Sequence, residues 1–329
     1  MDSSLLFIIV ITLMCIIVVK FWPRDINEGN NNSIEVRQVA AYQHNIDYVW
    51  EINRNDISVK NRVLGEGAFG IVYEGEWNGK IVAVKTINEL LTDAANYRRW
   101  MKNFKLEIDC MKKIGEHENI IQFLGCYTQD EPLYAILEYA SKGNLKSFLQ
   151  TSYINSSPME LLSYAEQVAQ GMKHLHEKNL IHRDLAARNI LVTEESKKIK
   201  MKIADFGFSI DIDITIEEYY EQKNKCLRYN KVYPVNWMAP EALLTKEYTL
   251  KSDVWSYGVL LWEIYTHGLR TPNYIDCSLL KEDKRLVQPS GCSDNVYDIM
   301  KACWEFYPIY RPTFNKLIIT FQNMLSREV

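Results

Sequence analysis

From about Trp50 to the end of the chain the hydrophobic pattern changes near Asn144, and that change limits the folds that this part can adopt. Between Trp50 and Asn144, short apolar runs are separated by turn residues and by one longer helix-like stretch, and Asn78-Gly79 between two such runs is a strong hairpin signal. After Asn144, longer segments with helical periodicity dominate. A strand-rich portion followed by a helical portion predicts two lobes with a cleft between them, where ligand sites tend to lie. We expect strands at 63–64, 71–75, 81–84, 120–127 and 133–139, and helices at 97–114, 160–177, 252–266, 294–304 and 313–325.

Composition narrows the class of protein further. With 329 residues and 47% hydrophobic content, the chain can form one large domain or two moderate ones with a well-buried core. Its net charge of -4 gives no support for nucleic-acid binding, which usually needs a basic surface. The seven cysteines are scattered, odd in number and without C-x-x-C spacing, so we expect free thiols in a reducing compartment.

The N-terminal run Leu5–Val19 has no charged residue. As a helix it would be about 22 Å long, and with the flanking residues up to Trp22 it approaches the hydrocarbon thickness of about 30 Å. A secretory signal peptide is the alternative, but Asp2 stands where such peptides carry positive charge. N-myristoylation is excluded, because it needs glycine directly after the initiator methionine.

We therefore predict a short extracytoplasmic tail at 1–4, a single-pass transmembrane anchor at 5–22 and a polar juxtamembrane linker at 23–49. Lys20 and Arg24 follow the apolar run, so the positive-inside rule predicts that the rest of the chain is cytoplasmic.

A glycine-rich loop, GEGAFGIV, places Gly65, Gly67 and Gly70 between two expected strands. A dinucleotide-binding fingerprint would require a helix after the loop, so that interpretation is disfavoured. The alternatives are a simple tight turn or a loop whose backbone N–H groups approach phosphates without side-chain obstruction.

Lys85 ends the expected strand that follows this loop, fifteen residues after Gly70. A hairpin of that length would return Lys85 beneath the glycines, where its charge could meet a nucleotide's phosphates. An isolated lysine at a strand end is normally just solvated. A functional Lys85 needs a fixed anion, and the helix expected at 97–114 offers Glu107 or Asp109.

A charged stretch, HRDLAARN, lies between the apolar flanks of residues 180–192, and an Asp-Phe-Gly turn follows at Asp205. Asn189 and Asp205 carry the hard oxygen ligands that suit Mg²⁺. Asp184 could accept the proton of an attacking hydroxyl. Each residue alone is better explained as a solvated ion pair or a turn residue, but their order and spacing favour phosphoryl transfer.

The ordered set GEGAFGIV, VAVK, Glu107, HRDLAARN, DFG and Ala239-Pro240-Glu241 resembles the protein kinases, from about residue 50 to about residue 325. The resemblance implies an α+β, bilobal kinase fold at 50–329, with a β-rich N-lobe containing one long helix at about 50–139. A mainly helical C-lobe would occupy about 140–326. The cofactors would be ATP and Mg²⁺, with Mn²⁺ as an alternative.

By this resemblance, Lys85 pairs with Glu107 and holds the α- and β-phosphates, and Asp184 is the catalytic base. Asn189 and Asp205 are the expected metal ligands. The expected nucleotide-binding residues are Leu64, Gly65, Glu66, Gly67, Ala68, Phe69, Gly70, Val72, Ala83, Lys85, Leu137, Glu138, Ala140 and Leu191.

Two features are similar to tyrosine kinases rather than to serine/threonine kinases. Serine/threonine kinases typically have lysine two residues after the catalytic aspartate, whereas this chain has Ala186 there and Arg188 two positions later. We therefore count Arg188 among the catalytic residues. Pro234-Val235-x-Trp237 resembles the platform for a substrate tyrosine, although Asn236 stands where that family usually has lysine or arginine.

The segment NIIQFLGCYTQDEPLYAILEYASKGNL is very similar to the fibroblast growth factor receptors. By that resemblance Leu137 is the gatekeeper, and the backbones of Glu138 and Ala140 bind adenine. Two structural roles are implied as well: Asp253 braces the catalytic loop, and Arg311 pairs with Glu241.

Tyr219 and Tyr220 fall at the twin-tyrosine position of these receptors, and we expect them to be phosphorylated. Arg183 and Arg228 are candidate partners for the added phosphate. The segment around 221–231 is longer than in the receptors, and so is the stretch between Lys85 and Glu107. Phe208-Ser209-Ile210 also replaces the usual Leu-Ala-Arg.

The sequence thus predicts a membrane-anchored protein tyrosine kinase in receptor-like signalling, without a ligand-binding ectodomain. Its expected partners are protein substrates with tyrosine, a second copy for trans-autophosphorylation and the lipid bilayer, but no nucleic acid. A pseudokinase or membrane scaffold is the first alternative, and a serine/threonine or dual-specificity kinase is the second.

Overall fold

The computed structural model describes residues 50–67, 70–87, 94–152, 156–213, 234–273 and 275–327. The chain divides into two compact units, Met1–Trp50 and Glu51–Val329, and almost everything described belongs to the second. The anchor expected at 5–22 and the linker expected at 23–49 lie outside the described residues. Within the described ranges, no helix combines the length and the apolar character needed to cross a bilayer.

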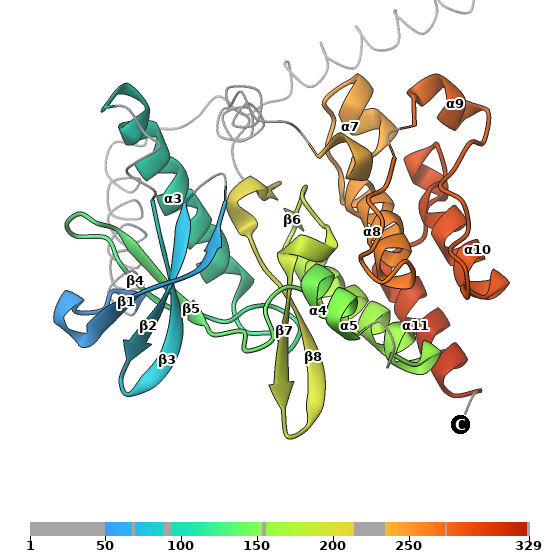
Figure 1. Ribbon diagram of the computed structural model, residues 1–329. Helices are drawn as coiled ribbons and strands as arrows, with labels where there is room; N and C mark the ends of the chain where they lie inside the picture. The colour runs from blue at the N-terminus through green and yellow to red at the C-terminus, as the bar shows by residue number, and fades with distance from the viewer. Residues whose placement is uncertain are drawn as a thin grey trace, which may run out of the picture. The chain divides into compact units, whose positions relative to one another are not determined.

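A five-stranded antiparallel sheet forms the first lobe of the second unit (Figure 1). Its order is β1 (Ile57–Glu66), β2 (Ile71–Trp77), β3 (Lys80–Thr86), β5 (Tyr134–Glu138) and β4 (Phe123–Tyr127). The β2–β3 turn has positive φ at both central residues, 50° at Asn78 and 71° at Gly79. This backbone matches the strand twist, so the hairpin prediction from Asn-Gly is confirmed.

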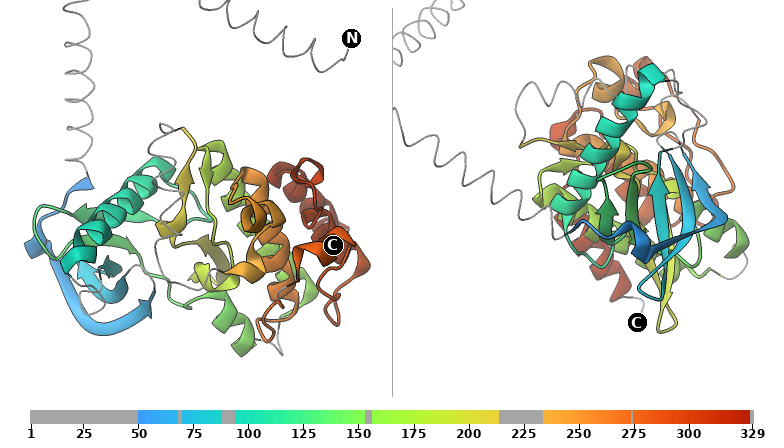
Figure 2. Two further views of the ribbon diagram at one scale, coloured as in Figure 1. Left: turned by 90° about the horizontal axis from the view of Figure 1, so that it is seen from above. Right: turned by 90° about the vertical axis from the view of Figure 1, so that its left-hand side faces the viewer.

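Helix α3 (Ala94–Ile114) lies against one side of the sheet, as Figures 1 and 2 both show. It confirms the helix expected at 97–114 and begins three residues earlier. The strands contribute a cluster of buried residues to the lobe's core: Ile57, Val82, Val84, Tyr134 and Ile136. Sheet and helix together form the expected strand-rich lobe.

The second lobe is mainly helical. Its helices are α4 (Leu145–Ser152), α5 (Pro158–Glu177), α7 (Pro240–Leu244), α8 (Leu250–Tyr265), α9 (Cys277–Lys281), α10 (Asp294–Cys303) and α11 (Phe314–Leu325). The four expected helices are confirmed to within two residues at each end. Short α4, α7 and α9 were not expected, because five to eight residues give little periodic signal.

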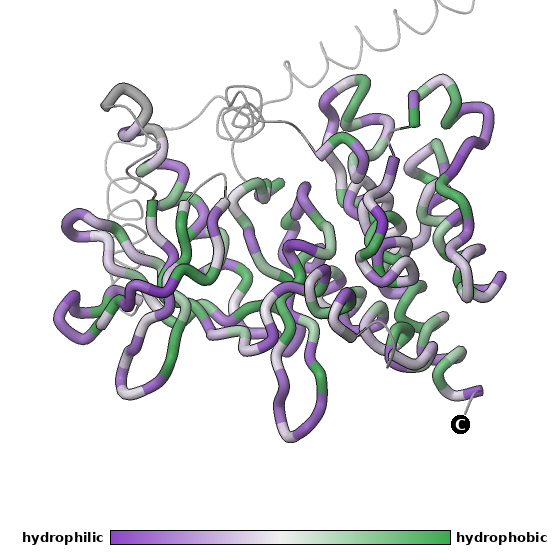
Figure 3. The backbone as a smooth tube through the Cα atoms, viewed as in Figure 1, coloured by the Kyte–Doolittle hydropathy of each residue, from purple (hydrophilic) through white to green (hydrophobic). Residues whose placement is uncertain are grey.

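Helix α8 occupies the centre of this lobe, with every residue from Ser252 to Tyr265 buried. Helices α5 and α11 pack on each other, and hydrophobic and hydrophilic residues alternate along both (Figure 3). Helix α5 starts at a capping box in which Ser157 and Glu160 each accept from the other's backbone N–H.

Two small two-stranded sheets lie between the lobes' main elements. β7 (Ile190–Glu195) pairs with β8 (Lys198–Ile203), and β6 (Leu180–Ile181) pairs with β9 (Ile210–Asp211). β6 and β7 flank residues 182–189, while β8 and β9 flank the turn at Asp205. Strand pairing therefore brings the two charged segments of the sequence together.

Candidate active site

Lys85 forms two ion pairs that join three separate parts of the chain. Its Nζ donates to Glu107 Oε1 at 2.5 Å and to Asp205 Oδ1 at 3.1 Å. Lys85 is 8% exposed and Glu107 is 4% exposed. The residues alone offered Glu107 or Asp109 as the partner of Lys85. The structure selects Glu107, because Asp109 lies on the exposed face of α3 and pairs with Lys112.

Lys85 and Asp205 stabilise each other's charged forms. Burial opposes the charge of Lys85, but attraction by Asp205 and Glu107 outweighs it and raises the pKa of the amine above its ordinary value. Burial likewise opposes the charge of Asp205, and Lys85 outweighs it and holds the pKa of that carboxyl below its ordinary value. Lys85 and Asp205 therefore both carry charge at neutral pH.

The glycine-rich loop approaches this lysine closely at one position. A Cβ on Gly70 would lie 2.1 Å from the carbonyl oxygen of Thr86, the residue after Lys85. Only glycine fits there without a shift of the backbone, which accounts for Gly70. Ala68 and Phe69 lie outside the described residues.

Asp253 holds the start of the catalytic loop, residues 182–189, by accepting hydrogen bonds from two backbone amides. Its carboxylate accepts from His182 N at 2.9 Å and from Arg183 N at 3.0 Å. Arg183 has a φ of 70°, a left-handed backbone that costs a non-glycine residue about 1–3 kcal/mol. The buried carboxylate offsets that strain and fixes the direction of the following residue, Asp184.

Asp184 is 7% exposed and is held by two neighbours on its own loop. Arg188 Nη2 donates to Asp184 Oδ1, and Asn189 Nδ2 donates to Asp184 Oδ2 at 2.8 Å. Burial raises the pKa of Asp184 above its ordinary value, although Arg188 pulls in the opposite direction. A raised pKa makes the ionised carboxylate a stronger proton acceptor than a solvated aspartate.

Asn189 and Asp205 have the donor atoms that a magnesium ion would require. Asn189 uses its amide nitrogen on the backbone and side-chain oxygens of Asp184, so its own side-chain oxygen is the atom that would meet a cation. Among the described residues no group of three or more His, Cys, Asp or Glu side chains could hold a metal. Mg²⁺ usually takes only one or two carboxylates plus phosphate oxygens, so this sparse set fits it.

A cavity of about 880 Å³ opens between the lobes. The predicted residues that line it are Leu64, Gly65, Glu66, Gly67, Val72, Ala83, Glu138, Ala140, Asp184, Arg188, Asn189, Leu191 and Asp205. Gly70, Lys85, Glu107 and Leu137 are not among its lining residues. The volume is in the range of a small-molecule site.

Further lining residues were not anticipated from the sequence: Arg62, Val63, Tyr139, Ser141, Gly143, Asn144 and Phe208. Gly143 has a φ of 73°, and Val192 N donates to its carbonyl oxygen at 2.8 Å. This turn folds Ser141 and Asn144 into the cavity wall. The Gly-Asn pair is a turn signal that could have indicated the bend, though not the wall that it completes.

The segment that links the lobes already uses some of its backbone groups. Glu138 N donates to Gln122 O at 2.9 Å, and Gly143 N donates to Ala140 O at 3.3 Å. Neither bond uses the carbonyl of Glu138 or the amide of Ala140, the two groups expected to bind adenine.

Residues 234–237 line the same cavity on the helical side. The guanidinium carbon of Arg188 lies 4.7 Å from the centre of the Trp237 ring. Asn236, which stands in place of the usual cation, donates through Nδ2 to Pro272 O at 2.7 Å. This bond ties the platform to the segment after α8.

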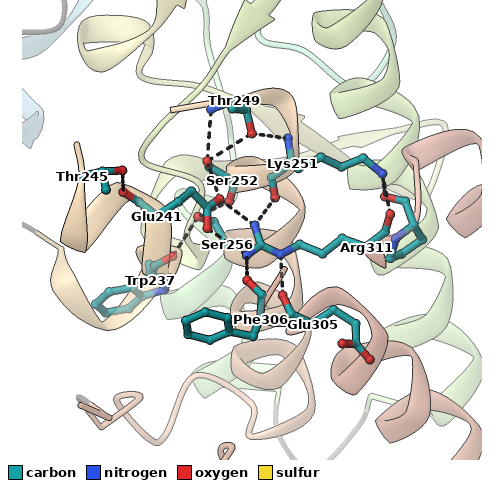
Figure 4. A network of polar contacts seen from close by, with 11 residues as sticks. Trp237, Glu241, Thr245, Thr249, Lys251, Ser252, Ser256, Glu305, Phe306 and Arg311 are labelled. Carbon is teal, nitrogen blue, oxygen red and sulfur yellow. Dashed lines mark hydrogen bonds and ion pairs between the residues drawn. The ribbon is translucent and has the colours of Figure 1, made fainter. Parts of the chain in front are cut away.

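Arg311 and Glu241 form the expected pair in the helical lobe, shown in Figure 4. Arg311 Nη1 and Nη2 donate to the two carboxylate oxygens of Glu241 at 2.7 and 2.9 Å. Ser252 Oγ adds a third bond to Glu241 at 2.8 Å. The pair fixes the end of the segment that carries Trp237.

Tyr219, Tyr220 and Arg228 lie outside the described residues, as does the long segment around 221–231. Arg183 lies within them. Its guanidinium carbon is 3.9 Å from the centre of the Tyr248 ring, and its Nη1 donates to Phe208 O at 3.3 Å.

The sequence of this chain is similar to those of known protein families and individual proteins. A model of the protein tyrosine and serine/threonine kinases matches residues 58–321. Fibroblast growth factor receptor homolog 2 of Drosophila melanogaster is 40% identical to this chain, covering 91% of it and 30% of the relative. Fibroblast growth factor receptor homolog 1 of the same fly is 40% identical, covering 90% and 42% respectively. Fibroblast growth factor receptor 1 of Xenopus laevis is 41% identical, covering 88% and 37%.

The fold and the site define a two-lobed phosphotransferase, and the chain belongs to the protein tyrosine and serine/threonine kinase family. Within that class its kinase domain is about 40% identical to those of fibroblast growth factor receptors. The chain spans 30–42% of the length of these three curated relatives. Membership of the family implies the use of ATP and Mg²⁺.

Proposed function

We propose that this chain is a protein tyrosine kinase that transfers the γ-phosphate of ATP to tyrosine hydroxyls of protein substrates. The observation that carries the proposal is the position of Asp184, which lines the cavity between the lobes with its carboxylate held by Arg188 and Asn189. Asp205 and residues 234–237 line the same cavity. Phosphoryl transfer needs this combination of a positioned acceptor and fixed charges.

Each charged residue then has a separate role in the reaction. Asp184 accepts the proton of the attacking hydroxyl. Lys85, held by Glu107, binds the α- and β-phosphates. Asn189 and Asp205 would hold Mg²⁺, which when bound offsets the charge of the transferred phosphate.

The nucleotide would lie between the glycine-rich loop and the segment that links the lobes. The apolar side chains that supply the faces for the adenine ring are Leu64, Val72, Ala83 and Leu191. The carbonyl of Glu138 and the amide of Ala140 would bind its polar edge, with Leu137 as the gatekeeper behind it. Gly65, Gly67 and Gly70 would let the loop's backbone approach the phosphates.

Tyrosine rather than serine is proposed as the acceptor because the cation near Asp184 comes from Arg188, four residues on. A cation that reaches the phosphate from that distance leaves room for a phenol ring. Pro234, Val235 and Trp237 line the same end of the cavity and supply an apolar surface for such a ring.

Membrane attachment is proposed from the uncharged run Leu5–Val19 and the basic residues after it. The kinase domain would then be cytoplasmic. Confinement in a bilayer would raise the local concentration of copies, which favours self-association and phosphorylation in trans. Relatives named as fibroblast growth factor receptors support a receptor-like place in signalling.

Purified chain with ATP and Mg²⁺ is expected to phosphorylate a random glutamate–tyrosine polymer. Phosphoamino-acid analysis should recover phosphotyrosine, because a phenol reaches past Arg188 to Asp184 whereas a serine hydroxyl is too short. A matched polymer with serine in place of tyrosine is the control. Phosphoserine as the main product would reject tyrosine specificity, and no transfer to either polymer would favour a pseudokinase.

Autophosphorylation at Tyr219 or Tyr220 is expected to raise activity. Added charge in this segment can pair with arginine and order the segment beside the platform at 234–237. The double variant Tyr219→Phe/Tyr220→Phe should therefore show no rise in catalytic rate after preincubation with ATP, unlike the parent chain. Tyr307→Phe removes an exposed tyrosine far along the sequence and serves as the control. An equal rise in the double variant would contradict the expectation.

A further inference from the structure

One buried carboxylate on α8 joins the catalytic loop to the substrate-side segment. Glu263 Oε2 accepts from Ala187 N at 2.9 Å and from Trp237 Nε1 at 2.9 Å. Glu263 is 3% exposed, and burial of a carboxylate is costly unless hydrogen bonds satisfy it. Burial raises the pKa of Glu263, and the bonds from Trp237 and Ala187 oppose that rise.

The contacts continue from Trp237 to the reacting end of the cavity. Arg188 lies with its guanidinium over the Trp237 ring and donates to Asp184. The Arg188 side chain is 38% exposed, so its long stem has freedom that only fixed neighbours can remove. An unbroken chain of contacts thus runs from Glu263 through Trp237 and Arg188 to Asp184.

We propose that Glu263 is a positioning residue for phosphoryl transfer. It fixes the indole of Trp237 and the backbone at Ala187, and the fixed indole holds Arg188 in the orientation that meets Asp184. The proposal rests on the kinase activity proposed above, in which Asp184 is the base. Glu263 is not among the residues that line the cavity.

The same contacts connect the base to the placement of residues 234–237 on the substrate side of the cavity. Trp237 belongs to the short 3-10 turn Val235–Trp237, which begins directly after Pro234 at the end of residues 214–233. A shift of this turn would move the indole away from Glu263 and release Arg188. Glu263 therefore makes the geometry of the catalytic loop depend on the position of residues 234–237.

A purely structural role predicts something different. If Glu263 only stabilised α8 against the loop, its loss would lower the melting temperature, and activity would fall only as far as unfolding explains. A positioning role predicts a fall in kcat at temperatures where the variant is fully folded. It also predicts that a neutral acceptor of the same shape restores the rate.

The test uses three variants of the full chain, each assayed with ATP and the glutamate–tyrosine polymer. Glu263→Met removes the acceptor at similar volume, and Trp237→Phe keeps a ring but removes the N–H. Both should lower kcat by about 10- to 100-fold with the KM for ATP unchanged, because small misplacements of catalytic groups have effects of this size. Glu263→Gln keeps an oxygen that can accept both bonds and should retain most of the rate.

Two matched controls separate position from general damage. Glu166→Met removes a buried acid of α5 that accepts from Gln170 Nε2 at 2.6 Å and from Gln322 Nε2 at 3.0 Å. Trp262→Phe removes an indole of α8 that donates to Val287 O at 2.8 Å. Both controls should keep kcat near that of the parent chain.

A second measurement does not depend on activity. Hydrogen exchange at the Ala187 amide should be faster by about 10-fold or more in Glu263→Met, because the amide loses a buried acceptor. It should stay near the parent rate in Glu263→Gln and in Glu166→Met. Unchanged protection in Glu263→Met, or a fall in kcat no larger than in the controls, would overturn the proposal. A parent chain without kinase activity would defeat the proposed function, while the exchange rates would still decide whether Glu263 holds the loop.

Discussion

Asp184→Asn is expected to lower the kcat for tyrosine phosphorylation by about 10²–10⁴-fold, the usual contribution of a general base. Asparagine keeps the size of the side chain, and its one amide oxygen can still accept from Arg188 or from Asn189. It cannot accept a proton, so the loss falls on the chemical step, and the KM for ATP should change little. Steady-state kinetics with the glutamate–tyrosine polymer measures both parameters.

The companion variant Lys85→Met tests the other end of the site. It removes the cation that Glu107 and Asp205 hold, and leaves the buried carboxylate of Glu107 and the partly exposed carboxylate of Asp205 without it. We expect a loss of about 10²–10³-fold in kcat, typical of one electrostatic stabiliser. Asp109→Asn, which changes an exposed acid on the same helix as Glu107, is the control. Activity that survives both Asp184→Asn and Lys85→Met would refute the roles proposed for these residues.

Glu241→Ala is expected to lower the free energy of unfolding by about 3–5 kcal/mol, because it leaves the buried guanidinium of Arg311 without its counter-ion. The Arg311 side chain has no measurable exposure, and two of its remaining bonds go to the carbonyls of Glu305 and Phe306. These carbonyls are neutral and offset only part of the loss. Urea unfolding of the parent chain and the variant measures the difference.

The control for this prediction is an ion pair of similar length but different burial. Lys173 and Glu177 are 2.6 Å apart on α5, and both are exposed. Glu177→Ala should produce little or no change in stability, since water and salt screen such pairs. An equal effect of Glu241→Ala and Glu177→Ala would show that burial does not govern the strength of the Glu241–Arg311 pair.

Local structure could be predicted from the sequence where the hydrogen bonds of an element form between residues close together in the chain. Asn78-Gly79 predicted a hairpin because both residues tolerate positive φ. The helices expected at 160–177 and 313–325 were found because their periodicity extends over three or more turns. Helix α9 was not found, since a helix of five residues has too little pattern.

The choice between Glu107 and Asp109 shows where local pattern stops being sufficient. The two residues are two positions apart on one helix, so they lie on different faces of it. Periodicity alone does not say which face meets Lys85. The packing of α3 buries Glu107, and the ion pair at 2.5 Å is the result.

The sequence by itself determined the order of the longer elements, the glycine-rich loop and the identity of the residues that carry charge, because each of these is written in a few neighbouring positions. Only the tertiary structure decided which charges meet. Lys85 and Asp205 are 120 positions apart, and Ala187 and Glu263 are 76 apart. Such contacts arise from strand pairing and helix packing over the whole domain, and no local pattern encodes a partner at that distance. The contacts of Glu263 could not be predicted for this reason. In the sequence Glu263 is one residue of a helix, and only the fold brings Trp237 and Ala187 to it.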